Sequence, residues 1–311
     1  MVLALARLLR LPNLFSAWAD IFLGWLVANP DWWWQNSSLG SRLQFILLLL
    51  CSSGIYLAGM VWNDIFDAKI DEIERPQRPI PAGKISLATA RGLGWGLFAA
   101  GLMASVAASA LSQNFLPMAT AAVLALTAHS YNAVLKFTPL GPVCLGLCRA
   151  LNVLLGMSTA VPMWEFWQVC IAAGLGIYIM GVTVFAAGEA GYSARTRLIV
   201  GWVVMLLGMA VLWFNPHWLR DYPPLPTKLE ASPLIWSYMW LALAGLISLR
   251  PLIAIANPHP QLVQLAVVQS LRSLIILDAV VCYSVRDAAG AVMILVLIIP
   301  SLLLGRWVYS T

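Results

Sequence analysis

The sequence predicts an all-α fold, a multi-pass transmembrane bundle of nine or ten helices. Hydrophobic residues make up 61% of the 311 positions and charged residues only 10%, whereas soluble domains carry roughly a quarter charged residues. The mean hydropathy is +0.84. The apolar residues also form continuous runs of about 20 residues, the length that crosses a bilayer, and they do not alternate as in the strands of a membrane barrel.

Ten apolar runs follow one another along the chain, and we interpret residues 1–311 as one integral-membrane domain. The runs cover residues 13–29, 42–62, 89–111, 116–135, 140–161, 165–187, 197–214, 233–250, 262–284 and 290–307. The run 262–284 contains Arg272 and Asp278, so a kinked or only partly inserted helix is the alternative there. For this reason the sequence predicts nine or ten spans.

The basic residues lie mainly in short segments between the runs, a pattern typical of membrane topology rather than of nucleic-acid binding. With a cytoplasmic N-terminus, twelve of the 18 Lys and Arg residues fall on the cytoplasmic side and four on the opposite side, with Arg149 and Arg272 inside the membrane. We therefore expect a multi-pass protein of the cell membrane and no nucleic-acid partner. Its long polar segments, residues 63–88 and 188–196, would carry the active-site loops on the cytoplasmic side.

The densest polar cluster follows the second run. Five of the thirteen acidic residues of the chain fall between Asp64 and Glu74. The residues that this spacing places close to one face of a helix are Asn63, Asp64, Asp67 and Asp71. Neighbouring carboxylates repel one another unless a cation joins them, and Mg²⁺ takes oxygen ligands and commonly bridges to substrate phosphates. The three aspartates are the predicted magnesium ligands; a solvated helix end with ordinary surface acids is the alternative.

The segment directly after this cluster, residues 75–86, is rich in proline and carries Arg78 and Lys84. Proline stiffens the backbone, and both kinds of basic side chain donate hydrogen bonds to phosphate. Because the segment adjoins the acidic face, we expect Arg78 and Lys84 to bind the phosphates of a substrate. Charge balance and membrane topology are the alternative explanation for the two basic residues.

The acidic and proline-rich motifs together resemble the first signature of the UbiA superfamily of intramembrane prenyltransferases. The matching residues are Asn63-Asp64-x-x-Asp67-x-x-x-Asp71 followed by Arg75-Pro76-x-Arg78-Pro79-x-Pro81-x-Gly83. The resemblance extends over most of the chain in hydropathy and loop spacing. It implies a helical bundle that binds a polyprenyl diphosphate through Mg²⁺. It also implies that the bundle transfers the prenyl group, within the membrane, to a lipophilic or small-molecule acceptor that the sequence does not identify.

Other positions fit the same resemblance. Arg10 and Asn13 lie where the family often has a basic residue and an asparagine entering its first helix. Tyr131, Asn132 and Lys136 resemble the fourth-loop signature of the family, in which the lysine reaches the diphosphate. The resemblance implies that Asn13, Tyr131 and Lys136 bind the substrate.

Arg149 and Asn152 are polar residues within the apolar run 140–161. Polar groups inside a membrane are usually functional or paired with one another. Both residues are therefore candidates for substrate binding. For Arg149, an ion pair with a carboxylate such as Asp20 is the other interpretation.

The second signature of the family, an aspartate-rich motif after the sixth helix, is altered in this chain. Glu189 is the only acid of residues 186–197, and Ser193 stands four residues later, where the family has a second carboxylate. Glu189 becomes the candidate catalytic base or second metal ligand, beside the catalytic aspartates 64, 67 and 71, and Arg195 a candidate phosphate-binding residue. A divergent branch of the superfamily, encoded with the Ebo metabolite clusters, has a similar loop.

The altered loop leaves two functions open at this point. One is magnesium-dependent prenyl transfer. The other is a non-catalytic membrane protein that binds a prenyl lipid or metabolite, as a scaffold or transport component, and retains the first diphosphate site.

Overall fold

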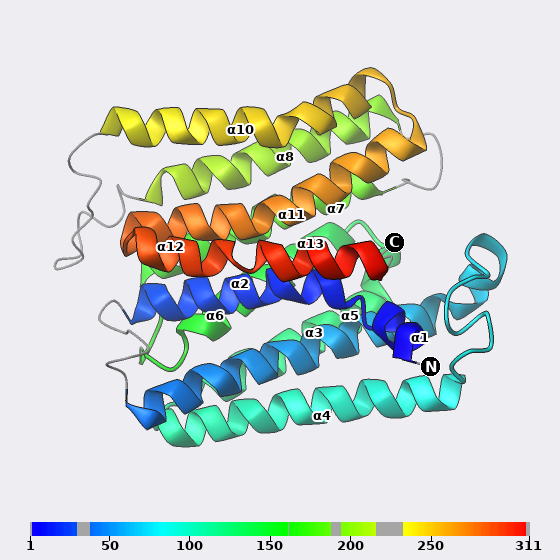
Figure 1. The fold of residues 1–311 in the computed structure, drawn as a ribbon, viewed down its shortest axis with the longest axis horizontal. Coiled ribbons are helices and arrows are strands. Elements are labelled where there is room, and N and C mark those ends of the chain that lie inside the picture. Colours follow the sequence, from blue (N-terminus) through cyan, green and yellow to red (C-terminus); the bar gives the residue numbers. More distant parts are fainter. Residues whose placement is uncertain (1, 30–37, 161, 188–193, 216–232, 309–311) are drawn as a thin grey trace.

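Helices form all the regular structure in the described residues of the computed structural model, which are 2–29, 38–160, 162–187, 194–215 and 233–308 (Figure 1). In chain order they are α1 (Val2–Leu8), α2 (Leu11–Ala28), α3 (Leu39–Glu74), α4 (Leu87–Ser112), α5 (Leu116–Ala133), the 3₁₀ turn η1 (Leu135–Phe137), α6 (Gly141–Met157), α7 (Phe166–Ala186), α8 (Arg195–Trp213), α10 (Pro233–Ala256), α11 (Pro260–Val285), α12 (Ala288–Leu295) and α13 (Ile298–Trp307). The predicted all-α fold is confirmed.

Each predicted apolar run coincides with a helix or, for the last run, with the pair α12 and α13. In the described part of the chain, eight segments are long and apolar enough to cross a membrane, and α6 is a shorter apolar helix. α5 adds a further helix of 18 residues. These segments agree with the predicted bundle of nine or ten membrane helices.

The charged residues of the run 262–284 do not interrupt the helix there. α11 is continuous from Pro260 to Val285, and it is one of the segments long and apolar enough to cross a membrane. The fully buried Asp278 pairs with Arg149 inside the bundle. The interruption falls instead between α12 and α13, because Pro300 lacks a backbone N–H and its ring clashes with the carbonyl four residues earlier.

α3 is the longest described helix and carries the whole acidic motif. It has 36 residues and ends at Glu74, so the segment expected to be a loop from residue 63 begins only at Arg75. The helix ends there because the ring of Pro76 disfavours helical backbone at the preceding residue, and Arg75 accordingly has φ −142° and ψ 58°. The next helix, α4, starts where the Ser86 hydroxyl accepts a hydrogen bond from the Thr89 amide, at 3.1 Å.

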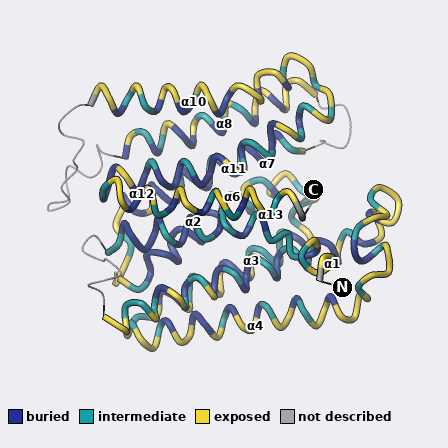
Figure 2. The backbone as a smooth tube through the Cα atoms, viewed as in Figure 1, coloured by how far each residue is buried: buried dark blue, intermediate teal, exposed yellow. Residues whose placement is uncertain are grey.

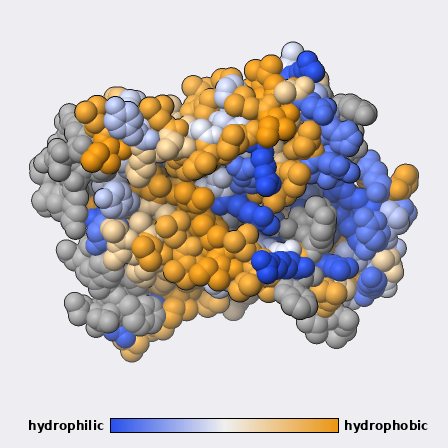
Figure 3. All heavy atoms as spheres, turned by 45° about the horizontal axis from the view of Figure 1, so that its top comes forward, coloured by the Kyte–Doolittle hydropathy of each residue, from blue (hydrophilic) through white to orange (hydrophobic). Residues whose placement is uncertain are grey.

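The helices run side by side, with α4 and α10 at opposite edges of the bundle (Figure 1). α2 lies in the interior and packs against α3, α6, α11 and α13, whereas α4 and α10 expose much of their length (Figure 2). Hydrophobic residues cover much of the middle of the molecule, and hydrophilic residues gather toward the end that carries both termini and residues 75–86 (Figure 3). This distribution fits a protein whose outer helices face lipid.

α2 and α6 approach each other closely at two glycines. A Cβ on Gly24 would lie 2.3 Å from the carbonyl oxygen of Val153, and one on Gly156 would lie 2.8 Å from that of Ile21. Small residues allow this backbone contact between membrane helices. One turn away, the same approach brings Asn152 to Asp20, with Nδ2 and Oδ2 2.8 Å apart.

Candidate active site

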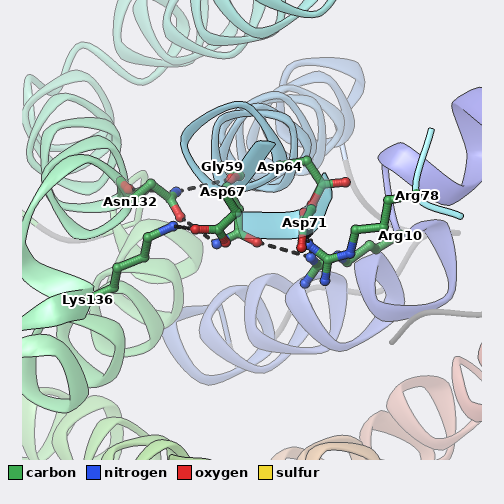
Figure 4. A network of polar contacts seen from close by, with 10 residues as sticks. Arg10, Gly59, Asp64, Asp67, Asp71, Arg78, Asn132 and Lys136 are labelled. Atoms are coloured by element: carbon green, nitrogen blue, oxygen red, sulfur yellow. Dashed lines mark hydrogen bonds and ion pairs between the residues drawn. The ribbon is translucent and has the colours of Figure 1, made fainter. Parts of the chain in front are cut away.

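The α3 motif forms one face of charged side chains, as its spacing predicts. Asp64 and Asp71 are each 4% exposed and Asp67 is half-buried. Three cations from other parts of the chain meet these carboxylates: Arg10, Arg78 and Lys136 (Figure 4). Three aspartates and three basic residues therefore balance in formal charge at the end of α3.

Arg10 reaches the cluster from the junction between α1 and α2. Its backbone has φ 46° and ψ 47°, in the left-handed region, which turns the chain sharply between the two helices. The guanidinium Nη2 donates to Asn63 Oδ1 and to Asp64 Oδ1, both at 3.0 Å. Arg10 thus joins the start of α2 to the acidic face of α3.

Arg78 reaches the cluster from the proline-rich segment. Its Nη1 lies 2.6 Å from Asp71 Oδ2 and 3.3 Å from Asp64 Oδ1. Two carboxylates that lie two helical turns apart therefore share one guanidinium. Arg78 therefore lies against the acidic face, where it was predicted to bind phosphate.

Lys136 completes the set from η1, and its Nζ lies 2.5 Å from Asp67 Oδ1. The neighbouring Asn132, at the end of α5, donates through Nδ2 to the carbonyl of Gly59 at 3.0 Å. Its Oδ1 accepts from Asn63 Nδ2 at 3.2 Å. These bonds fix α5 and η1 against α3, so that Lys136 faces the acidic motif.

The donor set of this cluster suits magnesium that arrives with a phosphate ligand. No three Asp, Glu, His or Cys side chains of the described ranges converge to hold a metal by themselves, and each α3 aspartate contacts a basic residue. Mg²⁺ in proteins is usually held by one or two carboxylates together with waters and substrate phosphates. A diphosphate would supply both the missing oxygen ligands and a counter-charge for the displaced basic side chains.

A cavity of about 350 Å³ adjoins the cluster and is lined by residues of α2, α3, α5, α6, α7, α11 and α13. Arg10 and Asn63 belong to both the cluster and the cavity wall. The sequence-predicted residues Asn13, Tyr131, Arg149 and Asn152 also line it. Apolar side chains such as Ile55, Leu124 and Ile179 provide much of the remaining wall.

Arg149 and Asn152 lie deeper in the cavity, in a second polar cluster. Arg149 Nη2 is 2.7 Å from Asp20 Oδ1 and 3.3 Å from Asp278 Oδ2. Asn152 also accepts a hydrogen bond from the Ser52 hydroxyl at 2.8 Å. The interpretation of Arg149 as a partner of Asp20 is therefore confirmed. Along α2, Asp20 lies about 15 Å beyond Arg10, so this cluster is separate from the α3 site.

Two of the predicted phosphate-binding residues, Lys84 and Arg195, do not join the α3 cluster. Lys84 lines a separate pocket with Arg7, Gln77 and Pro79. Arg195 is exposed at the start of α8 and donates to the carbonyl of Ala256 at 3.0 Å. Glu189 lies outside the described residues, so its predicted role stays a prediction.

Asn132, Asp278 and Arg272 were not among the predicted catalytic, metal-binding or substrate-binding residues. Asp278 and Arg272 carried a usable signal, because ionisable residues within an apolar run are rare and usually face a bundle interior or cavity. Asn132 stands in the fourth-loop signature, but its hydrogen bonds to Gly59 and Asn63 depend on how α5 packs on α3 and have no local signal in the sequence.

The fold and site define a helical membrane protein that places balanced carboxylates and basic residues beside a largely apolar cavity, an arrangement suited to an amphiphile with an anionic head. The chain matches the sequence model of the UbiA prenyltransferase family over residues 21–268. It therefore belongs to the UbiA prenyltransferase family. The similarity of residues 186–197 to the Ebo-associated branch stays a prediction.

Curated relatives and solved structures agree with this assignment. The chain is 34% identical over 105 residues to digeranylgeranylglyceryl phosphate synthase of Sulfurisphaera tokodaii, covering 34% of this chain and only 35% of that relative. It is 30% identical over 228 residues to the enzyme of the same name from Methanopyrus kandleri, covering 70% of this chain and 80% of that relative. A UbiA homologue from Archaeoglobus fulgidus bound to GPP and Mg²⁺ has a TM-score of 0.59 and 15% identity, covering 86% of this chain and 98% of that one. At this identity the solved structure shows a shared fold.

Proposed function

We propose that this protein transfers a prenyl group from a polyprenyl diphosphate to a lipophilic acceptor in the membrane, with Mg²⁺ as cofactor. The observation that carries the proposal is the pairing of three aspartates with three basic residues at the end of α3, beside the cavity. Each pair of opposite charges can open to take up a diphosphate and its metal without leaving a carboxylate unpaired. A plain surface helix would not need partners from α1–α2, residues 75–86 and η1.

The residues then divide by task. Asp64, Asp67 and Asp71 would hold Mg²⁺, which neutralises the diphosphate and makes it a better leaving group. Arg10, Arg78 and Lys136 donate hydrogen bonds to the phosphate oxygens. The apolar cavity wall receives the prenyl chain and keeps water from its reactive carbon.

In the transfer itself, the bond between the first prenyl carbon and the diphosphate oxygen breaks, and the diphosphate leaves with the electron pair. The nucleophile of the acceptor forms the new bond to that carbon and gives up its proton. Glu189 is the candidate proton acceptor, and Arg195 the candidate for added phosphate contact. The name of the relatives makes a glyceryl phosphate lipid the first acceptor to test.

Equilibrium binding of radiolabelled geranylgeranyl diphosphate to the purified protein, with and without Mg²⁺, tests the donor site. We expect Asp67→Ala to abolish the magnesium-dependent part of binding. Glu72→Ala is the matched control, since it removes an exposed acid of the same helix end and should bind as the unaltered protein does.

The same preparation then receives an acceptor panel that includes geranylgeranylglyceryl phosphate. Magnesium-dependent binding that is lost in Asp67→Ala, together with transfer, supports the proposed enzyme. Binding without transfer to any acceptor favours the alternative, a non-catalytic prenyl-lipid-binding protein. No binding of any polyprenyl diphosphate would rule out both.

A further inference from the structure

The wall of the cavity opposite α3 comes from α11 and α13. Its residues include Leu271, Arg272, Ile275, Ser301 and Gly305. All of them follow residue 268, where the match to the family model ends. This wall therefore lies beyond the residues matched by the family model.

Arg272 is the charged residue of this wall. The other cavity-lining cations of the described ranges are paired, Arg10 with Asp64 and Arg149 with Asp20 and Asp278. Arg272 makes no hydrogen bond or ion pair with any residue that the structure describes. Arg272 is exposed and lines the cavity, so its guanidinium is accessible to an anionic ligand there.

The guanidinium of Arg272 lies at the same level as the α3 site. The Ser301 hydroxyl donates to the carbonyl of Pro12 at 2.9 Å, which sets α13 beside the start of α2. Gly305 is one turn, about 6 Å, further along α13, toward the end that carries both termini (Figure 1). Arg272 Nη2 lies 3.7 Å from the Cβ position of Gly305, so it reaches the level of Arg10.

The charge balance of the α3 cluster is already complete without Arg272, because three basic residues meet three aspartates there. An additional unpaired guanidinium across the cavity is suited to a second oxyanion, which it can bind through two parallel hydrogen bonds. Gly305 has no side chain to cover the guanidinium, so an anion can approach it from the cavity.

We propose that Arg272 binds an oxyanion, a phosphate or carboxylate, on the acceptor. The acceptor is thus an anionic amphiphile, held at α11 and α13 while its nucleophile faces the α3 site. This inference rests on the proposed prenyl transfer and adds the acceptor class and the residue that selects it. A phosphate of the surrounding bilayer has the same chemistry, and the test distinguishes the two sources.

The test compares two acceptors that differ only in charge, geranylgeranylglyceryl phosphate and geranylgeranylglycerol. The full-length protein is assayed in a non-ionic detergent free of phospholipid, with geranylgeranyl diphosphate as donor and Mg²⁺. The variant is Arg272→Gln, and Arg272→Lys keeps the charge but loses the paired hydrogen bonds. Arg306→Gln is the control, since Arg306 is exposed on the same part of α13 and does not line the cavity.

For Arg272→Gln we expect the KM of the phosphate acceptor to rise about 10- to 100-fold, because the variant loses a charge-assisted hydrogen bond to the phosphate. The KM of the donor and the turnover of the neutral acceptor should stay as in the unaltered protein. For Arg272→Lys, the KM of the phosphate acceptor should lie between the values of the unaltered protein and of Arg272→Gln. Arg306→Gln should behave as the unaltered protein does.

Several results would overturn the inference. An equal loss of activity with both acceptors, or a higher KM of the donor, would mean that Arg272 acts in the donor site or is needed for folding. An unchanged KM in detergent, with an effect of Arg272→Gln only in nanodiscs of anionic phospholipid, would assign it to bilayer phosphate. Equilibrium binding of the two acceptors provides the same comparison without turnover. Failure of the proposed function appears separately, as absent donor binding in the unaltered protein.

Discussion

Arg78 connects two carboxylates of α3 through a single nitrogen, and residues 75–86 are thereby held over the acidic face. Asp71 and Asp64 lie 2.6 and 3.3 Å from its Nη1. Only a guanidinium combines this reach with further N–H groups that stay available for phosphate. At the scale of single residues, the site thus depends on the kind of basic side chain as well as on its charge.

Replacing Arg78 with lysine tests this dependence. Lysine keeps the charge but has no planar fork, so it can pair with one aspartate or bind phosphate without doing both. We expect Arg78→Lys to weaken magnesium-dependent binding of geranylgeranyl diphosphate about 10- to 100-fold, measured by equilibrium binding. Arg91→Lys, the same change at an exposed position of α4, is the control. Unaltered affinity in Arg78→Lys would mean that charge alone suffices.

The contact between α2 and α6 positions polar residues at the scale of whole elements. Asp20 and Asn152 each lie four residues before a glycine, Gly24 and Gly156, at which the two backbones meet. A side chain at either glycine would push the helices apart and lengthen the 2.8 Å hydrogen bond between Asp20 and Asn152. The shape of the deep cavity wall therefore depends on two residues that contribute no side chain to it.

We expect Gly24→Ala to destabilise the protein by about 1–3 kcal/mol, the usual cost of overpacking. Its new Cβ would meet the backbone oxygen of Val153, which cannot move independently of α6. Thermal unfolding in detergent measures the effect. Gly96→Ala is the matched control, because that position on α4 has nothing within 4 Å of the new Cβ. There the change should be neutral or stabilising by about 0.5–1 kcal/mol. Equal melting temperatures for both variants would contradict the close contact.

Across the whole molecule, the sequence predicts what depends on local periodicity. The apolar runs locate the helices, and the spacing of Asp64, Asp67 and Asp71 places them on one face. The pairs formed across the fold are not encoded locally: Arg10 and Asp64 are 54 residues apart, and Lys136 and Asp67 are 69 apart. For the same reason, the sequence could suggest Asp20 as a partner of Arg149 but not Asp278, and it could not reveal that Arg272 has no partner among the described residues.

The orientation of the bundle is a prediction at this scale. If the positive charges mark the cytoplasmic side, Gln77 lies inside the cell and Gln113, between α4 and α5, lies outside; both are exposed. In a variant without the five native cysteines, a membrane-impermeant maleimide should label Gln77→Cys only in inside-out vesicles. Gln113→Cys should be labelled only in right-side-out vesicles. The reverse pattern would invert the topology.

The length of α3 has a consequence for the products of the proposed reaction. A helix of 36 residues is about 54 Å long, whereas the hydrocarbon core of a bilayer is about 30 Å thick. We therefore expect the turns with the aspartates, at the C-terminal end of α3, to extend beyond the hydrocarbon. Free diphosphate partitions into water and the prenylated product into lipid, so the two products enter different phases. Reversal would require both to return to one site at once, so we expect this separation to favour the forward direction of the proposed reaction.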